Sequence, residues 1–202
     1  MANVYAIHSV GTSIADYLAK TYPKELSDAH PCQFRVISSF ELSKSEDFAS
    51  TTTLTLFLYR VTINEQLRNT AKPATALTWD IPLSLDLHFM ATVWANDFLT
   101  EHLITAWTMR QLYTRPTLSA ADLSPEAEWG PGEIVQLVPE EISLHDLMRI
   151  WDAFEPKYRL SYTYVARVVR LDAEFPRSVG QPVVAKRLDL RDPPDPRAKV
   201  KP

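Results

Sequence analysis

The sequence contains little glycine and almost no cysteine. Its four glycines stand at positions 11, 130, 132 and 180, and none of their spacings forms a GxGxxG motif or a phosphate-binding loop. The usual nucleotide-binding motifs are therefore excluded. The single cysteine, Cys32, excludes an internal disulfide and is typical of a reducing compartment. Cys32 follows a proline in a polar stretch, and we expect an inert thiol there.

Long apolar runs and a strong net charge are also missing. The chain has no run of about 18 apolar residues, so we expect no membrane span. Its first residues lack the basic start and the apolar block of a signal peptide. The net charge of −4 argues against a general nucleic-acid binder. With 202 residues, of which 46% are hydrophobic, the chain is long enough for one domain with a packed core. Together these features predict a protein of the cytoplasm.

Motifs for metal binding and catalysis are missing as well. None of the five histidines stands in HxH or HExxH spacing, so no metal site and no cofactor is expected. GxSxG and SxxK are also absent from the sequence. One pair, Asp86 and His88, shares a face of a predicted strand and suits a base with its orienting carboxylate. Because no nucleophile motif accompanies the pair, we interpret it as a solvent-facing or interface pair, with a small hydrolase as the alternative.

Five stretches are predicted to be β-strands, of which residues 34–40 and 133–138 are the short ones. The strand at residues 54–63 is apolar on both faces and is therefore predicted in the middle of a sheet. Its two faces consist of Leu54, Leu56 and Leu58, and of Phe57, Tyr59, Val61 and Ile63. A second strand, at 80–90, has one apolar and one polar face. The longest, at 158–171, is rich in aromatic and β-branched residues and is predicted beside the first.

Helical spacing of apolar residues appears in three further stretches. The first helix is predicted to begin after Asn3 as its cap and to contain Gly11, where the loss of helix propensity indicates a close backbone contact. The second helix opens at Asn96 or Asp97 and places Leu99, Leu103, Ala106 and Tyr113 on one face. Ser143 is predicted to cap the third, with Asp146 as its partner. This order of elements predicts an α+β fold: a mainly antiparallel sheet with helices packed on it.

The carboxyl-terminal part of the sequence differs in composition from the rest. We predict one domain over residues 1–175 and an extension over 176–202, with a possible edge strand at 182–190 followed by a proline-rich tail. Residues 185–202 contain six Lys or Arg and three Asp, a net +3, so the rest of the chain carries −7. This contrast permits docking of the tail on a neighbouring subunit, although a solvated tail is the simpler interpretation.

Arg60 is unusual because it lies in a predicted strand that is otherwise apolar on both faces. A buried arginine needs a carboxylate or carbonyl partner, and Asp80 and Asp86 on the next strand are the candidates. The alternative is an arginine that extends into solvent at a sheet edge.

Several blocks resemble, in order, one family of proteins. The blocks are IHSVGTSIADYL, FLYRVTINEQLRN, PLSLDLHFM, WTMRQLY and LMRIWDAFEPKYRLSYTYVARVV. They are similar to the sheath-terminator or cap proteins of extracellular contractile injection systems of the virulence-cassette type, which are related to phage tail terminators. The likeness covers roughly residues 3 to 172. The matching positions include Leu58-Tyr59-Arg60, Asn64, Arg68-Asn69, Leu85 to His88, Trp151 and Leu160-Ser161-Tyr162, whereas many relatives have tyrosine at the position of Phe89.

The resemblance implies a structural protein and no enzyme. It implies an α+β domain that forms a homo-hexameric ring on the inner tube and the last sheath ring, at the end distal to the baseplate. Its partners are then sheath and inner-tube subunits, without nucleic acid or a membrane span. Assembly in the bacterial cytoplasm would precede release of the particle. A connector or baseplate adaptor with the same fold is the alternative. The residues expected at the assembly interface are Arg60, Asn64, Arg68, Asn69, Asp86 and His88, and the charged tail adds Arg187 and Arg191.

Overall fold

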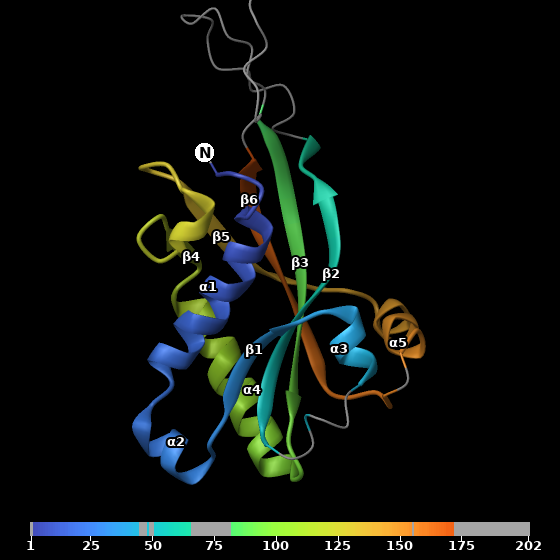
Figure 1. Ribbon diagram of the computed structural model, residues 1–202. Helices are drawn as coiled ribbons and strands as arrows, with labels where there is room; N and C mark the ends of the chain where they lie inside the picture. Colours follow the sequence, from blue (N-terminus) through green and yellow to red (C-terminus); the bar gives the residue numbers. More distant parts are fainter. Residues whose placement is uncertain (1, 45–47, 49–50, 66–81, 155, 172–202) are drawn as a thin grey trace, which may run out of the picture.

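A computed structural model describes residues 2–44, 48, 51–65, 82–154 and 156–171. Figure 1 shows the course of the chain, and the C-terminal extension predicted at 176–202 lies outside the described residues. The helices are α1 (Ala6–Thr21), α2 (Lys24–Ala29), α3 (Ser39–Ser43), α4 (Phe98–Thr114), the 3₁₀ helix η3 (Pro125–Ala127) and α5 (Leu144–Asp152). The strands are β1 (Gln33–Ile37), β2 (Thr53–Ile63), β3 (Leu83–Trp94), β4 (Thr117–Ser119), β5 (Ile134–Glu140) and β6 (Ser161–Leu171). Among the described helices, none is long and apolar enough to cross a membrane.

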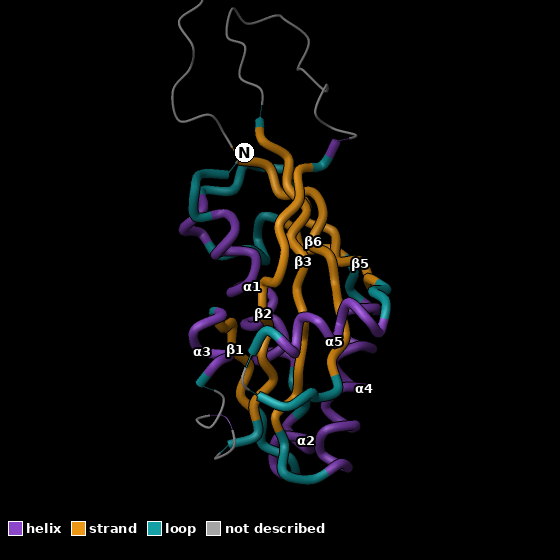
Figure 2. Tube along the Cα trace, turned by 90° about the vertical axis from the view of Figure 1, so that its right-hand side faces the viewer, coloured by secondary structure: helices purple, strands orange, loops and turns teal. Residues whose placement is uncertain are grey.

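The six strands form one sheet in the order β1-β2-β3-β6-β5-β4. Only β1 and β2 pair in parallel; the other four pairings are antiparallel. The predicted α+β fold with a mainly antiparallel sheet is therefore confirmed. The sheet is strongly twisted, and helices lie on both of its faces (Figures 1 and 2).

Two apolar cores lie back to back on the sheet. The larger core packs α1 and α4 against one face, where Val10, Ile14 and Ile104 are almost fully buried. The smaller core packs α3 and α5 against the other face and centres on Trp94 and Trp151, whose ring centroids are 6.1 Å apart. Neighbouring residues of one strand thus serve different cores, because successive side chains of a strand point to opposite faces.

The strand predicted at residues 54–63 is β2, an inner strand between β1 and β3, but β3 is the more deeply buried of the two. β3 is buried along almost its whole length and pairs with β2 on one side and β6 on the other. β6, predicted beside residues 54–63, does not pair with β2. The two-faced apolar pattern of β2 is explained by its first half, since only Thr53–Phe57 is covered by β1 and by both cores.

A β-bulge in β2 changes which side chains share a face. The register with β3 shifts between Leu58 and Arg60, so Tyr59 is the extra residue. Beyond the bulge, Val61 lies opposite Leu87 and therefore on the face of the larger core. The sequence had grouped Tyr59, Val61 and Ile63 with Phe57, which points into the smaller core. The grouping of Tyr59 with Phe57 is confirmed, but the alternation of faces was wrong for Val61 and Ile63.

The buried side of α4 is not the side that the sequence indicated. Leu99 and Tyr113, predicted on the apolar face, are exposed. The side chains that face the sheet are Thr100, Ile104, Thr105, Trp107, Thr108 and Leu112. At Thr108 the hydroxyl finds a partner within the helix, because Oγ1 donates to the carbonyl of Ile104 at 2.8 Å. The helix consequently carries apolar side chains on both its inner and its outer face.

The predicted helix starts are confirmed where a side chain caps the backbone. Asp97 accepts from the N–H of Thr100 at 2.8 Å, and Ser143 accepts from the N–H of Asp146 at 3.1 Å. Asn3 does not cap α1 itself, because the residue before the first helical position is Tyr5. The capping box of α3 and the short helix α2 were missed, since both lie in stretches that appeared to be polar loops.

Candidate assembly interface

A cluster of polar side chains lies on the sheet face that carries α5. Its centre is His88, whose Nδ1 is 2.9 Å from Glu140 Oε1 and whose Nε2 is 2.9 Å from Thr62 Oγ1. Tyr59 Oη donates to the same carboxylate, Glu140 Oε2, at 2.6 Å. Glu140 stands at the end of β5, so one carboxylate joins side chains of β2 and β3 to β5 across β6.

The second part of the cluster is centred on Asp86. Asn64 Nδ2 donates to both of its carboxylate oxygens, at 3.2 and 3.1 Å, and Arg167 Nε lies 3.5 Å from Oδ2. Asp86 and His88 are both buried, with 6% and 7% of their surfaces exposed. Buried charged and polar groups are stable only when such partners are present.

Asp86 and His88 share a face, as predicted, but they do not form a base with its orienting carboxylate. Both ring nitrogens of His88 are engaged, by Thr62 and by Glu140. The carboxylate that contacts the ring is therefore that of Glu140, not that of Asp86. In the described part of the chain, no group of three or more His, Cys, Asp or Glu is placed to hold a metal ion. The polar side chains of the cluster are hydrogen-bonded to one another.

Burial changes the acidity of two further groups. The pKa of the Tyr59 hydroxyl is raised, first because the ring is buried and then because the hydroxyl donates to Glu140. Burial likewise raises the pKa of Cys32 to about 11. The thiol is therefore protonated at neutral pH, which agrees with the inert thiol expected from the sequence.

The remaining predicted interface residues are distributed differently. Arg60 is exposed, and Asp86, one of its two predicted partners, binds Asn64 and Arg167 instead. For Arg60 the structure therefore fits the solvent-directed alternative. The predicted positions Asp80, Arg68, Asn69, Arg187 and Arg191 lie outside the described residues.

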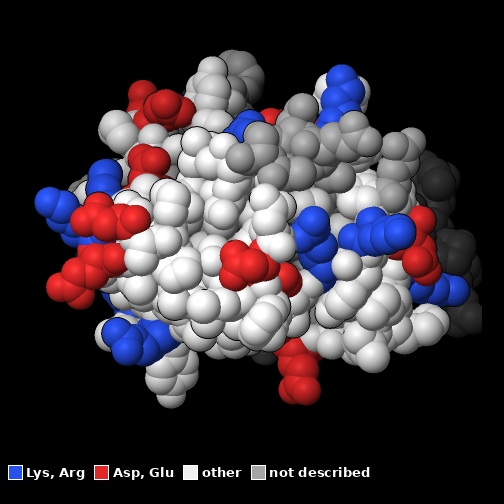
Figure 3. All heavy atoms as spheres, turned by 90° about the horizontal axis from the view of Figure 1, so that it is seen from below, with Lys and Arg blue, Asp and Glu red and all other residues white. Residues whose placement is uncertain are grey.

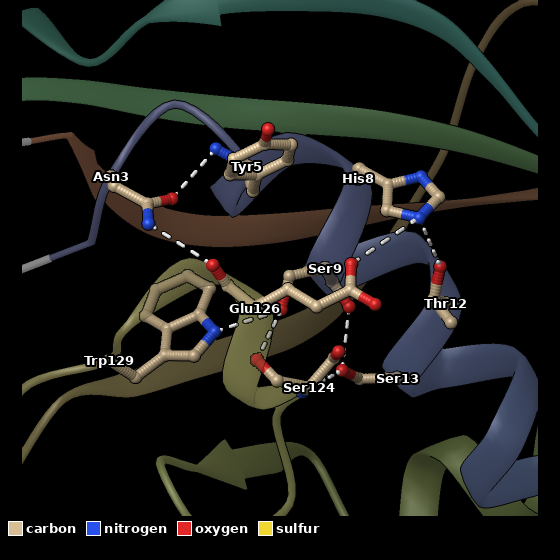
Figure 4. A network of polar contacts seen from close by, with 9 residues as sticks. All are labelled: Asn3, Tyr5, His8, Ser9, Thr12, Ser13, Ser124, Glu126 and Trp129. Atoms are coloured by element: carbon tan, nitrogen blue, oxygen red, sulfur yellow. Dashed lines mark hydrogen bonds and ion pairs between the residues drawn. The ribbon is translucent and has the colours of Figure 1, made fainter.

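A second polar network fixes the start of α1 (Figure 4). Ser9 Oγ donates to the carbonyl of Ser124 at 3.0 Å and accepts from Trp129 Nε1 at 2.9 Å. One turn later, Ser13 Oγ accepts from the N–H of Ser124 at 2.8 Å. Asn3 Nδ2 adds a bond of 3.1 Å to the carbonyl of Glu126. The first two turns of α1 are thereby attached to the loop that carries η3.

His8 lies beside this network and is exposed. Its Nε2 is 3.9 Å from Glu126 Oε2 and 3.5 Å from Thr12 Oγ1, and its side chain has 65% of its surface exposed. Such a contact between exposed groups contributes little to stability.

Charged side chains are unevenly distributed over the end of the molecule that carries α2 and the start of α4. Figure 3 shows them gathered toward the two sides of this surface, around an area that is largely uncharged but interrupted by acidic side chains. Large apolar side chains are exposed on α4 as well, among them Phe98 and Tyr113, 74% and 75% exposed. Exposed apolar side chains of this size are typical of surfaces that contact other proteins.

Several residues of the two networks could not be found from the sequence. Glu140 and Arg167 lie far along the chain from His88 and Asp86, and only the folded sheet brings them together. Ser9 and Ser13 carry a weak signal, because small polar residues one turn apart on a helix mark a face that meets backbone groups. Their partner Trp129 carries none.

The comparison with protein families decides the relationship of this chain. Residues 9–185 match the family described as the Pvc16 N-terminal domain, which is most of the chain. The chain belongs to this family. The ordered blocks that the sequence shares with terminator and cap proteins are thus confirmed as a family resemblance. Among curated proteins, none matches the chain.

Two solved structures match this member of the Pvc16 N-terminal domain family, and the first of them shares its fold. One is the PVC sheath/tube terminator of an extracellular contractile injection system in its extended state, with a TM-score of 0.59 and 17% identity over 93% of this chain. This chain spans 64% of that protein's length. The other is the tube-terminating cap of the anti-feeding prophage, with a TM-score of 0.48 and 15% identity, covering 70% of this chain and 50% of that one.

Proposed function

We propose that the protein is a structural terminator that ends the tube and sheath of a contractile injection system. The observation that carries the proposal is the family match over residues 9–185, together with the fold shared with a sheath/tube terminator over 93% of the chain. The site geometry supports it, since the two polar networks are satisfied internally and the exposed apolar side chains lie outside them. The molecule then acts through its surfaces.

The proposed assembly is a ring of six copies on the end of the particle distal to the baseplate. Head-to-tail contacts between identical subunits close into a ring, and a ring face that matches no further subunit stops growth. Inner-tube and sheath subunits are the proposed partners on the matching face. Assembly takes place in the bacterial cytoplasm, and the ring stays on the particle when it is released.

Within this ring, the polar cluster around His88 would have an indirect role. Asp86 and His88 are too deeply buried to meet a neighbour directly. Asp86 holds Asn64 at the end of β2, and so fixes the point from which residues 66–81 continue. We assign direct contact with a neighbouring subunit to the exposed Arg60, and to Arg68 and Asn69.

The segment after Phe175 supplies the proposed contact with the sheath. A strand at 182–190 can pair with an exposed strand of a sheath subunit through backbone hydrogen bonds, and Arg187 and Arg191 add charge of the opposite sign to that of the body. If particles made with a chain truncated after Phe175 kept their sheath length and yield, this part of the proposal would be wrong.

The length distribution of particles tests the proposed function directly. Particles produced without this protein should have tubes and sheaths of irregular length, and the wild-type gene should restore a single length. The exchange Arg60→Glu should give a partial defect, whereas the exposed control Lys24→Glu on α2 should not. Unchanged lengths in the absence of the protein would contradict a terminator. Loss of the baseplate under the same conditions would indicate the connector or adaptor instead.

A further inference from the structure

The outer edge of β2 is covered along only half of its length. β1 pairs with Thr53–Phe57, and no described strand pairs with the outer side of residues 58–63. The N–H of Asn64 donates to the carbonyl of Ser84 on β3 at 2.9 Å. Because backbone groups alternate in direction along a strand, the N–H and C=O of Ile63 and Val61 then point to the opposite, outer side. Such an edge readily accepts another strand.

The side chains at this edge are apolar as well as exposed. Val61 and Ile63 are 44% and 58% exposed, and Leu83, on the same face of β3, is 44% exposed. They flank Leu85 and Leu87, which are fully covered by the larger core. The apolar face of the sheet thus continues past the part that the described helices cover.

The chain leaves the described structure at the same end of the sheet as this edge, on the other side of β3. β6 ends at Leu171, which lies opposite Leu83 on β3, and β3 in turn places Leu85 opposite Ile63 on β2. The other side of Leu171 is occupied, because Ala2 forms a parallel bridge with it. Three strand spacings separate β6 from the outer side of β2, about 14 Å. The ten residues 172–181 reach about 33 Å when extended, which is ample.

We propose that residues 182–190 of the same chain form a seventh strand on the outer edge of β2, antiparallel to Leu58–Ile63. The segment PVVAKRLDL contains residues suited to an edge strand. Because successive side chains alternate between faces, Val184 and Leu188 share one face with Lys186, and Val183 shares the other with Arg187. The family match extends to residue 185, fourteen residues past β6, so the conserved domain includes the start of this segment. A short linker gives an intramolecular strand a high effective concentration at the edge.

This inference is independent of the proposed function, and it gives that function a more definite geometry. A seventh strand would cover the edge of β2 and present its own outer edge to a neighbouring sheath subunit. The test needs only the purified full chain, whereas the terminator proposal is tested on particles. Failure of one therefore leaves the other standing.

Amide hydrogen exchange measured by NMR tests the seventh strand. In the wild-type chain, the amides of Val61 and Ile63 should exchange at least about tenfold more slowly than in the variant Val184→Pro, because proline removes a backbone donor and disfavours the strand. The control Val200→Pro, in the tail, should leave both amides as in the wild type. Protection should not change with protein concentration.

Three results would overturn the proposal. Fast exchange of Val61 and Ile63 in the wild type would show an open edge. Protection that persists in Val184→Pro would assign the covering strand to another segment. Protection that increases with concentration would assign it to a second copy. The spectrum of Val184→Pro away from β2 reports whether the variant is folded, and a seventh strand predicts that the amides of β3 and β6 keep their protection.

Discussion

His88 and Glu140 meet across an intervening strand. The ring of His88 projects from β3, the carboxylate of Glu140 ends β5, and β6 runs between these strands in the sheet. After Glu140 the chain leaves β5 and continues to α5, which lies on the opposite side of the molecule in Figure 1. The contact between His88 and Glu140 thus connects β3 to the end of β5 across β6.

Loss of the Glu140 carboxylate should destabilise the fold measurably. In Glu140→Ala the hydroxyl of Tyr59 and the ring of His88 lose their partner, and leaving buried polar groups without one costs about 1–3 kcal/mol. The free energy of unfolding from urea titration measures this. Glu141→Ala, at an exposed position, is the matched control and should stay near the wild-type value. Equal values for both variants would show that the cluster contributes nothing.

Gly11 in α1 is a site where a small substitution should stabilise the protein. A Cβ added there would lie 3.4 Å from Phe89 Cε1 and from Val36 Cγ1, within ordinary contact. Gly11→Ala should therefore add about 0.5–1 kcal/mol through helix propensity. Gly11→Leu should cost about 1–3 kcal/mol, since its larger side chain has no space beside Phe89 and Val36. Thermal unfolding should show opposite shifts of the midpoint for the two variants. A lower midpoint for both would mean that even a methyl group is too large.

The cap of α5 gives a further expectation. Ser143→Ala removes the acceptor for the N–H of Asp146 and should cost about 1 kcal/mol of unfolding free energy. Ser27→Ala, on the exposed surface of α2, is the control. Urea unfolding followed by tryptophan fluorescence is suitable, because Trp151 lies on α5 in the smaller core. A loss as large in Ser27→Ala would rule out a specific effect of the cap.

Asp122 should make stability depend on pH in the acidic range. Hydrogen bonds from Ser119, and then the charge of Arg115, hold the pKa of this carboxyl below the ordinary value of an aspartate. A lowered pKa means that the folded state binds fewer protons than the unfolded state. The contribution is therefore complete above the unfolded pKa and is lost as the pH falls through the folded value. Stability curves of Asp122→Asn should decline less steeply below about pH 4 than those of Asp28→Asn. Parallel curves would contradict this.

Cys32 should react slowly with alkylating reagents. Burial raises the pKa of the Cys32 thiol to about 11, which lowers the thiolate fraction at pH 8 by about a hundredfold relative to an ordinary thiol. The alkylation rate should thus rise tenfold with each pH unit up to about pH 10. The urea-unfolded chain provides the control and should react at the rate of an ordinary thiol. A folded-state rate equal to that of the unfolded chain would show that the thiol is not shielded.

The sequence predicted the elements better than their arrangement. The caps at Asp97 and Ser143 could be predicted, because each depends on hydrogen bonds within four residues. The bulge at Tyr59 could not, since it is defined only by the register with β3. The buried face of α4 was misassigned because threonines on that face appear polar in the sequence, although their methyl groups pack against the sheet.

In the candidate site, too, the local features could be predicted from the sequence and the long-range partners could not. Asp86 and His88 were correctly placed on one face, since alternation within a strand is a local property. Their partners Glu140 and Arg167 depend on the strand order, which propensity does not determine. The sequence left two interpretations of Arg60 open, because it does not show how far β1 extends along β2. In the structure the pairing with β1 ends at Phe57, before Arg60.

The two cores share the strands between them, and this has a consequence for how the molecule melts. Leu56 lies in one core and its neighbour Phe57 in the other, on the same stretch of backbone. Unfolding of α3 and α5 would expose Phe57 and Trp94 to water. The strands that carry these two residues also form the face on which α1 and α4 pack. Neither half can be lost alone without weakening the other. Heat should therefore disorder the molecule in one cooperative step, with calorimetric and van't Hoff enthalpies in agreement.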